Sequence, residues 1–200
     1  TRVPMNIVRH QDVPLDGTAP AILHGYGGFS ISETGMFSYS TEIIFFVKHF
    51  RGIYASANIR GGSEYGEKWH VGGMLLNKQN VFDDFEAAAE FLIKTNYTKS
   101  SKLTITGASN GGLLIGACVN QRPELYGAAI PQVGVMDMLR FQKFTHTIGS
   151  SSKQTNPLLL RVETNAGHGA GTPTSKLLDE KTDIYSFIAQ NLGLEFNASN

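Results

Sequence analysis

Short, uninterrupted apolar runs alternate with amphipathic segments along this 200-residue chain, and this alternation constrains its fold more than any other feature. Such runs are typical of strands buried on both faces of a parallel sheet, and the segments between them carry apolar residues at helical spacing. The pattern predicts an α/β domain over residues 1–200, with a mostly parallel sheet and helices on both faces. An alternating, amphipathic strand is expected at residues 3–7, and strands of the continuous apolar kind at 21–23, 53–55, 103–105, 128–130 and 158–160. The expected helices occupy residues 40–50, 81–94, 111–121 and 175–190.

The turn after the expected strand at 102–106 reads GASNGG (residues 107–112) and leads into an apolar helix. Ligands of parallel α/β sheets bind at the carboxyl ends of the strands, so this turn is placed where chemistry is expected. A G-x-S-x-G sequence between a strand and a helix predicts a nucleophile elbow, in which Ser109 is exposed above the sheet. The alternatives are a plain structural turn or a phosphate loop, and the missing lysine after the glycines counts against the latter.

A serine nucleophile needs a base, and the chain offers six histidines. In the nucleophile-elbow fold the triad follows the order serine, acid, histidine, which leaves His146 and His168. His168 lies in a glycine-rich turn directly after the expected strand at 158–162, so we predict it as the base. His146 lies in a threonine-rich stretch without such a context.

A third turn, HGYGGF (residues 24–29), follows the early strand at 21–23. Esterases of this fold carry an H-G-G-G-like loop there, whose backbone N–H groups help form the oxyanion hole. Here Tyr26 replaces one glycine, and its phenol could donate a hydrogen bond while the backbone N–H of Asn110 supplies the second donor. The alternative is a loop in which Tyr26 and Phe29 pack as core aromatics.

Charge and cysteine content exclude several classes of function. The chain has 17 basic and 17 acidic side chains, so its formal net charge of zero argues against nucleic-acid or membrane-surface partners. Its apolar runs are too short to span a membrane. The single cysteine, Cys118, cannot form an internal disulfide. The first residues do not form a charged-then-apolar leader, so we expect a cytoplasmic location. Because the chain opens on Thr1, we also expect it to be a piece of something longer.

These turns, together with four further segments, closely resemble the catalytic domain of the prolyl oligopeptidase family of α/β-hydrolases. The segments are NIRGGSEYGE (58–67), NKQN (77–80), QVGVMDM (132–138) and AGHGAG (166–171). The resemblance implies a cytosolic serine peptidase that cleaves short peptides after proline and needs no cofactor or metal. It also implies the following roles: Ser109 as nucleophile, His168 as base, Tyr26 and Asn110 as oxyanion donors, and Phe29 and Val135 as lining of the proline pocket.

The chain departs from this family in two places. The family carries an amino-terminal β-propeller that gates access to the site, and we identify none here. It also carries a stretch with the proline-stacking tryptophan, the catalytic aspartate and a substrate-anchoring arginine, and that stretch is missing. The spacing of the expected elements leads to the same conclusion. Only residues 134–157 remain unassigned between them, whereas one βαβ unit needs roughly 30 residues or more. We therefore expect a sheet truncated by about one strand–helix element.

Three carboxylates lie between the expected serine and histidine, namely Glu124, Asp137 and Glu163. Asp137 follows the expected strand at 127–133 at its carboxyl end and is the possible substitute acid. Glu124 and Glu163 are poorly placed to orient His168. Without an acid the imidazole can adopt the wrong tautomer, which lowers the rate by about 10⁴-fold.

Three functions remain open from the sequence. The first is a serine peptidase of prolyl oligopeptidase type. The second is a general esterase on the same fold, which would hydrolyse acyl esters but not Gly-Pro peptides. The third is a catalytically impaired truncated form with a binding role or none, whose shortened sheet would expose apolar surface.

Overall fold

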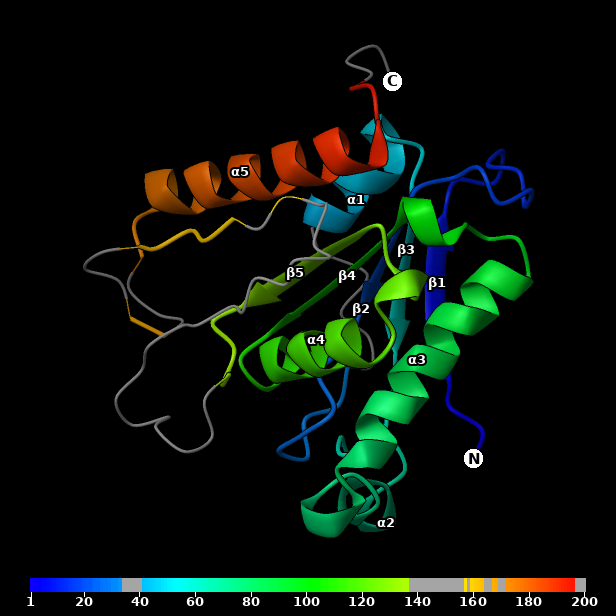
Figure 1. The fold of residues 1–200 in the computed structure, drawn as a ribbon, viewed down its shortest axis with the longest axis vertical. Coiled ribbons are helices and arrows are strands. Elements are labelled where there is room, and N and C mark those ends of the chain that lie inside the picture. The colour runs from blue at the N-terminus through cyan, green and yellow to red at the C-terminus, as the bar shows by residue number, and fades with distance from the viewer. Residues whose placement is uncertain (34–40, 137–156, 158, 164–166, 169–171, 197–200) are drawn as a thin grey trace.

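The structure is a computed structural model that describes residues 1–33, 41–136, 157, 159–163, 167–168 and 172–196. Within these ranges the strands form one sheet in the order β1-β3-β2-β4-β5 (Figure 1). They are β1 (Met5–Arg9), β2 (Ala21–His24), β3 (Ile53–Ala57), β4 (Leu103–Ala108) and β5 (Ala128–Gln132). β1 pairs antiparallel with β3, and the other neighbours pair in parallel. The mostly parallel α/β class expected from the sequence is confirmed.

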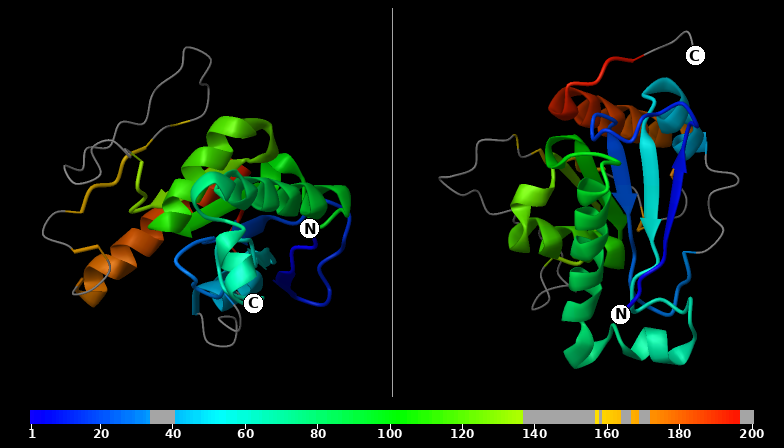
Figure 2. Two further views of the ribbon diagram at one scale, coloured as in Figure 1. Left: turned by 90° about the horizontal axis from the view of Figure 1, so that it is seen from below. Right: turned by 90° about the vertical axis from the view of Figure 1, so that its right-hand side faces the viewer.

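Helices cover both faces of the sheet (Figures 1 and 2). One face carries α1 (Thr41–His49) and α5 (Thr174–Leu192), and the other carries α3 (Gln79–Lys94) and α4 (Asn110–Gln121). A short helix, α2 (Glu67–Val71), and 3₁₀ turns at Leu75–Asn77, Ser100–Lys102 and Pro123–Leu125 lie in the connections.

The two helical layers explain why the central strands are apolar without interruption. Successive side chains of a strand point to opposite faces. Leu23 of β2 therefore joins the buried cluster that contains Phe85 of α3, while its neighbour Ile22 joins the cluster that contains Phe46 of α1. Both faces are buried, so both side chains must be apolar.

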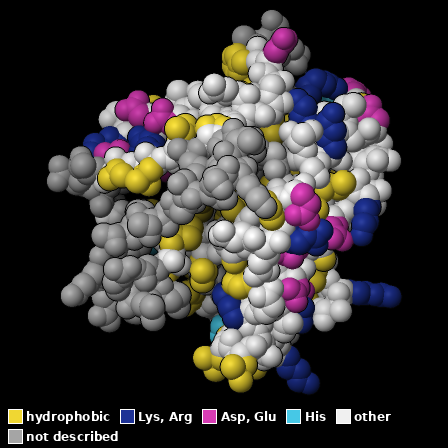
Figure 3. All heavy atoms as spheres, in the orientation of Figure 1, with side chains coloured by type: hydrophobic (Ala, Val, Ile, Leu, Met, Phe, Trp, Pro, Cys, Tyr) yellow, Lys and Arg dark blue, Asp and Glu magenta, His cyan; other side chains and the backbone are white. Residues whose placement is uncertain are grey.

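The strand expected at 158–160 is not formed by the part of this segment that the structure describes. Residues 159–163 are irregular, and the side chains of Leu159, Leu160 and Val162 are 71%, 59% and 67% exposed. Figure 3 shows hydrophobic side chains at the surface beside α5, where this segment runs. A strand needs a neighbour for its hydrogen bonds, and the described sheet ends at β5 without pairing to residues 159–163. The prediction of a strand at these residues was therefore wrong.

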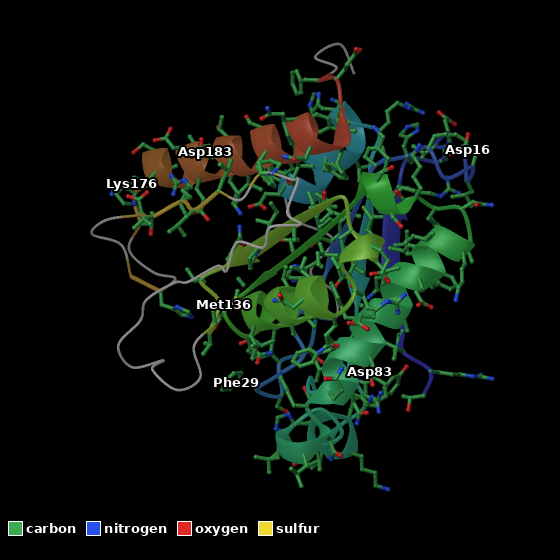
Figure 4. All side chains as sticks on the ribbon, viewed as in Figure 1. Asp16, Phe29, Asp83, Met136, Lys176 and Asp183 are labelled. Carbon is green, nitrogen blue, oxygen red and sulfur yellow. The ribbon has the colours of Figure 1, made fainter. Side chains whose placement is uncertain are left out.

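Ion pairs hold this segment against α5 in place of sheet pairing. Arg161 Nε donates to Asp183 Oδ2 at 2.8 Å, and Lys176 Nζ donates to Glu163 Oε1 at 2.5 Å. Figure 4 labels Lys176 and Asp183 on α5 beside the segment. All four side chains are 28–63% exposed, and ion pairs of that kind contribute at most about 1 kcal/mol each. The segment that leads to His168 is thus held by weak contacts.

The loop after β3 is fixed to α3 by a largely buried ion pair. Asp84 is 5% exposed and accepts hydrogen bonds from the backbone N–H of Arg60 at 3.0 Å and from its Nε at 2.8 Å. The Arg60 Nη2 donates to the other carboxylate oxygen at 2.5 Å. These bonds hold the pKa of the Arg60 guanidinium above its usual value.

Replacing Asp84 with asparagine should lower the free energy of unfolding by about 3 kcal/mol, because it leaves a largely buried guanidinium without its counter-charge. Urea denaturation monitored by circular dichroism measures the change. The matched control is Asp83→Asn, at the exposed neighbouring residue, which should cost less than about 0.5 kcal/mol. Equal losses in the two variants would contradict the role assigned to Asp84.

Candidate active site

Ser109 stands on a strained turn between β4 and α4. Its φ of 57° and ψ of −112° lie outside the regions that non-glycine residues ordinarily adopt. A Cβ at Gly107 would lie 2.7 Å from the carbonyl oxygens of both Gly25 and Gly111, and one at Gly111 would lie 2.7 Å from the same Gly25 oxygen. Only glycine fits at either position, so the G-x-S-x-G spacing follows from packing the elbow against the loop after β2.

The structure brings Ser109 and His168 together. The Ser109 Oγ and the His168 Nε2 lie 3.0 Å apart, which is hydrogen-bonding distance for a nucleophile and its base. Ser109 is half-buried and His168 is exposed, although 59 residues separate them in the sequence. The arrangement allows proton transfer from the hydroxyl to the imidazole.

Neither glutamate that the sequence offered as an acid bonds to His168. Glu124 accepts a hydrogen bond from Arg122 Nε at 2.5 Å. Glu163 accepts from Lys176 and Arg161, and the bond from Lys176 is the main reason why its pKa is lowered. Asp137 lies outside the described residues, so its role as a substitute acid stays a prediction. Within the described ranges, no carboxylate bonds to the second ring nitrogen of His168.

The loop after β2 is held directly against the elbow. Asn110 Nδ2 donates to the carbonyl oxygen of Tyr26 at 2.6 Å, and Gly25 N donates to Thr106 O at 3.3 Å. Tyr26 is half-buried at this junction. The first N–H groups of a helix lack intrahelical partners, so the Asn110 N–H, at the start of α4, is suited to receive an oxyanion.

The two residues expected to line a proline pocket, Phe29 and Val135, differ in their burial. Phe29 is 74% exposed and projects from the loop after β2, so it does not pack as a core aromatic (Figure 4). Val135 is half-buried after β5. A cavity that the structure does form lies between α1, α5 and the sheet, and neither Phe29 nor Val135 lines it. Their substrate-binding role stays a prediction.

Two side chains at this site were missed by the sequence reasoning. The Asn110 residue was expected to act through its backbone alone, yet its side-chain amide bridges the elbow to the Tyr26 loop. Lys78 was noted only as part of NKQN, yet its Nζ contacts both the elbow and that loop. The NKQN segment is one of those that carry the family resemblance, and this is the signal that could have indicated a role for Lys78.

No group of metal-ligating side chains occurs among the described residues. Over the same residues, no helix is both long and apolar enough to cross a membrane.

A model of the prolyl oligopeptidase family matches residues 37–151 of the chain. The chain is 40% identical to prolyl oligopeptidase ophP of Omphalotus olearius, covering 97% of this chain and 34% of that protein. It is 38% identical to the prolyl endopeptidase of Dictyostelium discoideum, covering 98% of this chain and 34% of that protein. The chain therefore spans about a third of the length of these curated relatives.

A solved structure of prolyl oligopeptidase B from Galerina marginata, bound to a 35mer hydrolysis and macrocyclization substrate, superposes with a TM-score of 0.87. It is 34% identical, covering 98% of this chain and 36% of that one. In this and two companion structures of that protein a histidine, an aspartate or a serine has been replaced by alanine. The alignments with the two curated relatives run over 256 and 262 residues, so both relatives carry residues within the matched span that have no counterpart in this 200-residue chain.

Proposed function

This chain belongs to the prolyl oligopeptidase family, and from that membership we propose that it is a serine-type oligopeptidase that cleaves short peptides after proline. The observation that carries the proposal is the 3.0 Å approach of the His168 Nε2 to the Ser109 Oγ on a strained elbow. The same membership, with the neutral net charge, supports a cytoplasmic enzyme that acts on proline-containing peptides without a cofactor, nucleic acid or membrane partner.

The geometry supports the following steps. The Ser109 Oγ attacks the carbonyl carbon of the proline residue, and its proton passes to the His168 Nε2. The oxyanion that forms accepts hydrogen bonds from the Asn110 N–H and the Tyr26 hydroxyl. When the C–N bond breaks, His168 returns the proton to the leaving amine, and water then hydrolyses the acyl-enzyme on Ser109 by the same route.

Two observations support a reduced rate for this chain. The described residues supply no carboxylate to orient His168. In prolyl oligopeptidase B, the replaced aspartate lies between the replaced serine and histidine in sequence, and these two are about twice as far apart as the 59 residues between Ser109 and His168. The relatives therefore have room for an acid-bearing segment that this chain lacks. A catalytically impaired form is the second candidate function.

Incubation with a fluorophosphonate tests the proposal directly. The intact mass of the purified chain should increase by one probe unit, because such probes react only with an activated serine. The Ser109→Ala variant should show no adduct, whereas Ser63→Ala, which removes a hydroxyl that donates to the Ser30 carbonyl oxygen, should be labelled as the parent is. A folded parent chain that stays unlabelled would overturn the peptidase proposal and leave the impaired form.

Substrate choice separates the peptidase from a general esterase on the same scaffold. We expect hydrolysis of a Gly-Pro aryl amide, with little hydrolysis of the corresponding amide that carries alanine in place of proline. Hydrolysis of acyl esters alone would favour the esterase.

A further inference from the structure

Lys78 lies between the elbow and the loop after β2. Its Nζ donates to the carbonyl oxygen of Gly27 at 3.1 Å and to the side-chain Oδ1 of Asn110 at 3.2 Å. The residue directly precedes α3, and its ammonium lies 5.9 Å from the centre of the Phe82 ring. Burial lowers the pKa of this ammonium, so the charge is partly withdrawn from water. One cation thus contacts both segments that would surround an oxyanion.

The Asn110 side chain closes a ring of contacts with Lys78. Its Oδ1 accepts from Lys78, while its Nδ2 donates to the Tyr26 carbonyl oxygen at 2.6 Å. Asn110 is 7% exposed, and a Cβ at Gly28 would lie only 2.5 Å from its Nδ2. The loop therefore packs on the Asn110 amide with no space to spare.

We propose that Lys78 is a positioning residue for the reaction, which holds the loop after β2 against the elbow so that Tyr26 and Asn110 donate to the same oxyanion. The inference rests on the function proposed above, since an oxyanion forms only if Ser109 attacks a carbonyl. Because this oxygen is charged only in the transition state, Lys78 should affect kcat rather than KM.

A cation suits this place for an electrostatic reason. The Gly27 carbonyl and the Asn110 Oδ1 are both acceptors that converge on one point, so without a donor between them their partial negative charges face each other. An ammonium donates to both, and such charge-assisted bonds are about twice as strong as neutral ones. A methionine of similar length keeps the packing against Phe82 but cannot donate.

The test compares Lys78→Met with Lys94→Met. Lys94 is an exposed lysine at the last residue of α3, paired with Glu90, so its removal subtracts the same charge at the opposite end of that helix from Lys78. We expect Lys78→Met to lower the rate of Ser109 phosphonylation, and kcat for a Gly-Pro aryl amide, by about 10- to 100-fold, as when charge-assisted hydrogen bonds are lost. KM should stay within about twofold, and Lys94→Met should leave both parameters within about twofold.

Rescue tests the ammonium itself. A Lys78→Cys variant should lose the same rate and regain most of it after alkylation with 2-bromoethylamine, which rebuilds a side chain of lysine length that ends in an ammonium. Cys118 is fully buried and its thiol pKa is raised by burial, so it should resist the reagent. The parent chain treated in the same way is the control. Failure of the alkylated variant to regain rate would overturn the proposal.

Hydrogen exchange separates this proposal from the proposed function. In Lys78→Met, backbone amides of residues 24–31 should exchange several-fold faster than in the parent and in Lys94→Met, as measured by mass spectrometry. This result is expected whether or not the parent reacts with the fluorophosphonate, so a failed peptidase proposal leaves the loop-positioning role testable. Unchanged exchange in Lys78→Met, or an unchanged phosphonylation rate in a labelled chain, would overturn it. If Lys78→Met does not fold, the unalkylated Lys78→Cys variant, which also removes the ammonium donor, carries the same comparison.

Discussion

A chimera with a restored acid should hydrolyse a Gly-Pro aryl amide about 10⁴-fold faster than this chain. In the chimera, residues 137–156 are replaced by the longer segment that prolyl oligopeptidase B of Galerina marginata carries at the corresponding place. The physical reason is the tautomer of His168: its Nε2 must be free of a proton to accept one from Ser109. A carboxylate on the other ring nitrogen enforces that state, and its loss costs about 10⁴-fold in kcat.

The control for this experiment is the same chimera with the aspartate of the inserted segment changed to asparagine. That variant keeps the inserted segment but not the charge, so its rate should fall back near that of the parent chain. Fluorophosphonate titration counts the active serines and corrects for misfolded material. A chimera that folds, titrates fully and is no faster than the parent would contradict the view that an acid is what this chain lacks.

The central strands could be predicted from the sequence because their apolar runs follow from burial between two helical layers. Ile22 and Leu23 read as a buried strand because each of them meets a helical layer, a requirement that is local to the run. The run at 158–160 has the same composition, but a strand also needs a neighbour, and that requirement lies elsewhere in the chain. Composition alone therefore gave a wrong strand. The five-residue helix α2 is too short for helical periodicity to reveal it.

The candidate site likewise contains residues whose position the sequence predicts and contacts that it does not predict. Ser109 could be placed from its sequence because the glycines around it are imposed by close packing against Gly25, which fixes their spacing. The contacts of Lys78 could not, because they join residues that are 51 and 32 positions apart and no spacing rule relates them. Phe29 was expected either in the core or at a pocket, and its high exposure excludes the core.

The weak attachment of the segment before His168 links the fold to the chemistry. In a complete parallel sheet, the strand before a catalytic loop fixes the loop by its ladder of hydrogen bonds. Here that task falls to exposed pairs such as Arg161 with Asp183, which salt screens. Among the described residues, the segment at 159–163 is therefore held by contacts much weaker than those that hold Ser109, which β4, α4 and the Gly25 loop contact from three sides.

Replacing His168 with alanine should lower the rate by only about 100-fold in this chain, but by about 10⁶-fold in the chimera. Triad residues act as a unit: loss of the histidine costs about 2 × 10⁶-fold where the acid is present, and loss of the acid alone already costs about 3 × 10⁴-fold. The quotient of these losses, about 100-fold, is what the histidine still contributes without its acid. Phosphonylation rates of the four proteins measure the coupling, with His10→Ala, at an exposed histidine, as the matched control in both backgrounds. Equal losses in the two backgrounds would show that His168 acts independently of any acid, and the assignment of a broken triad would then be wrong.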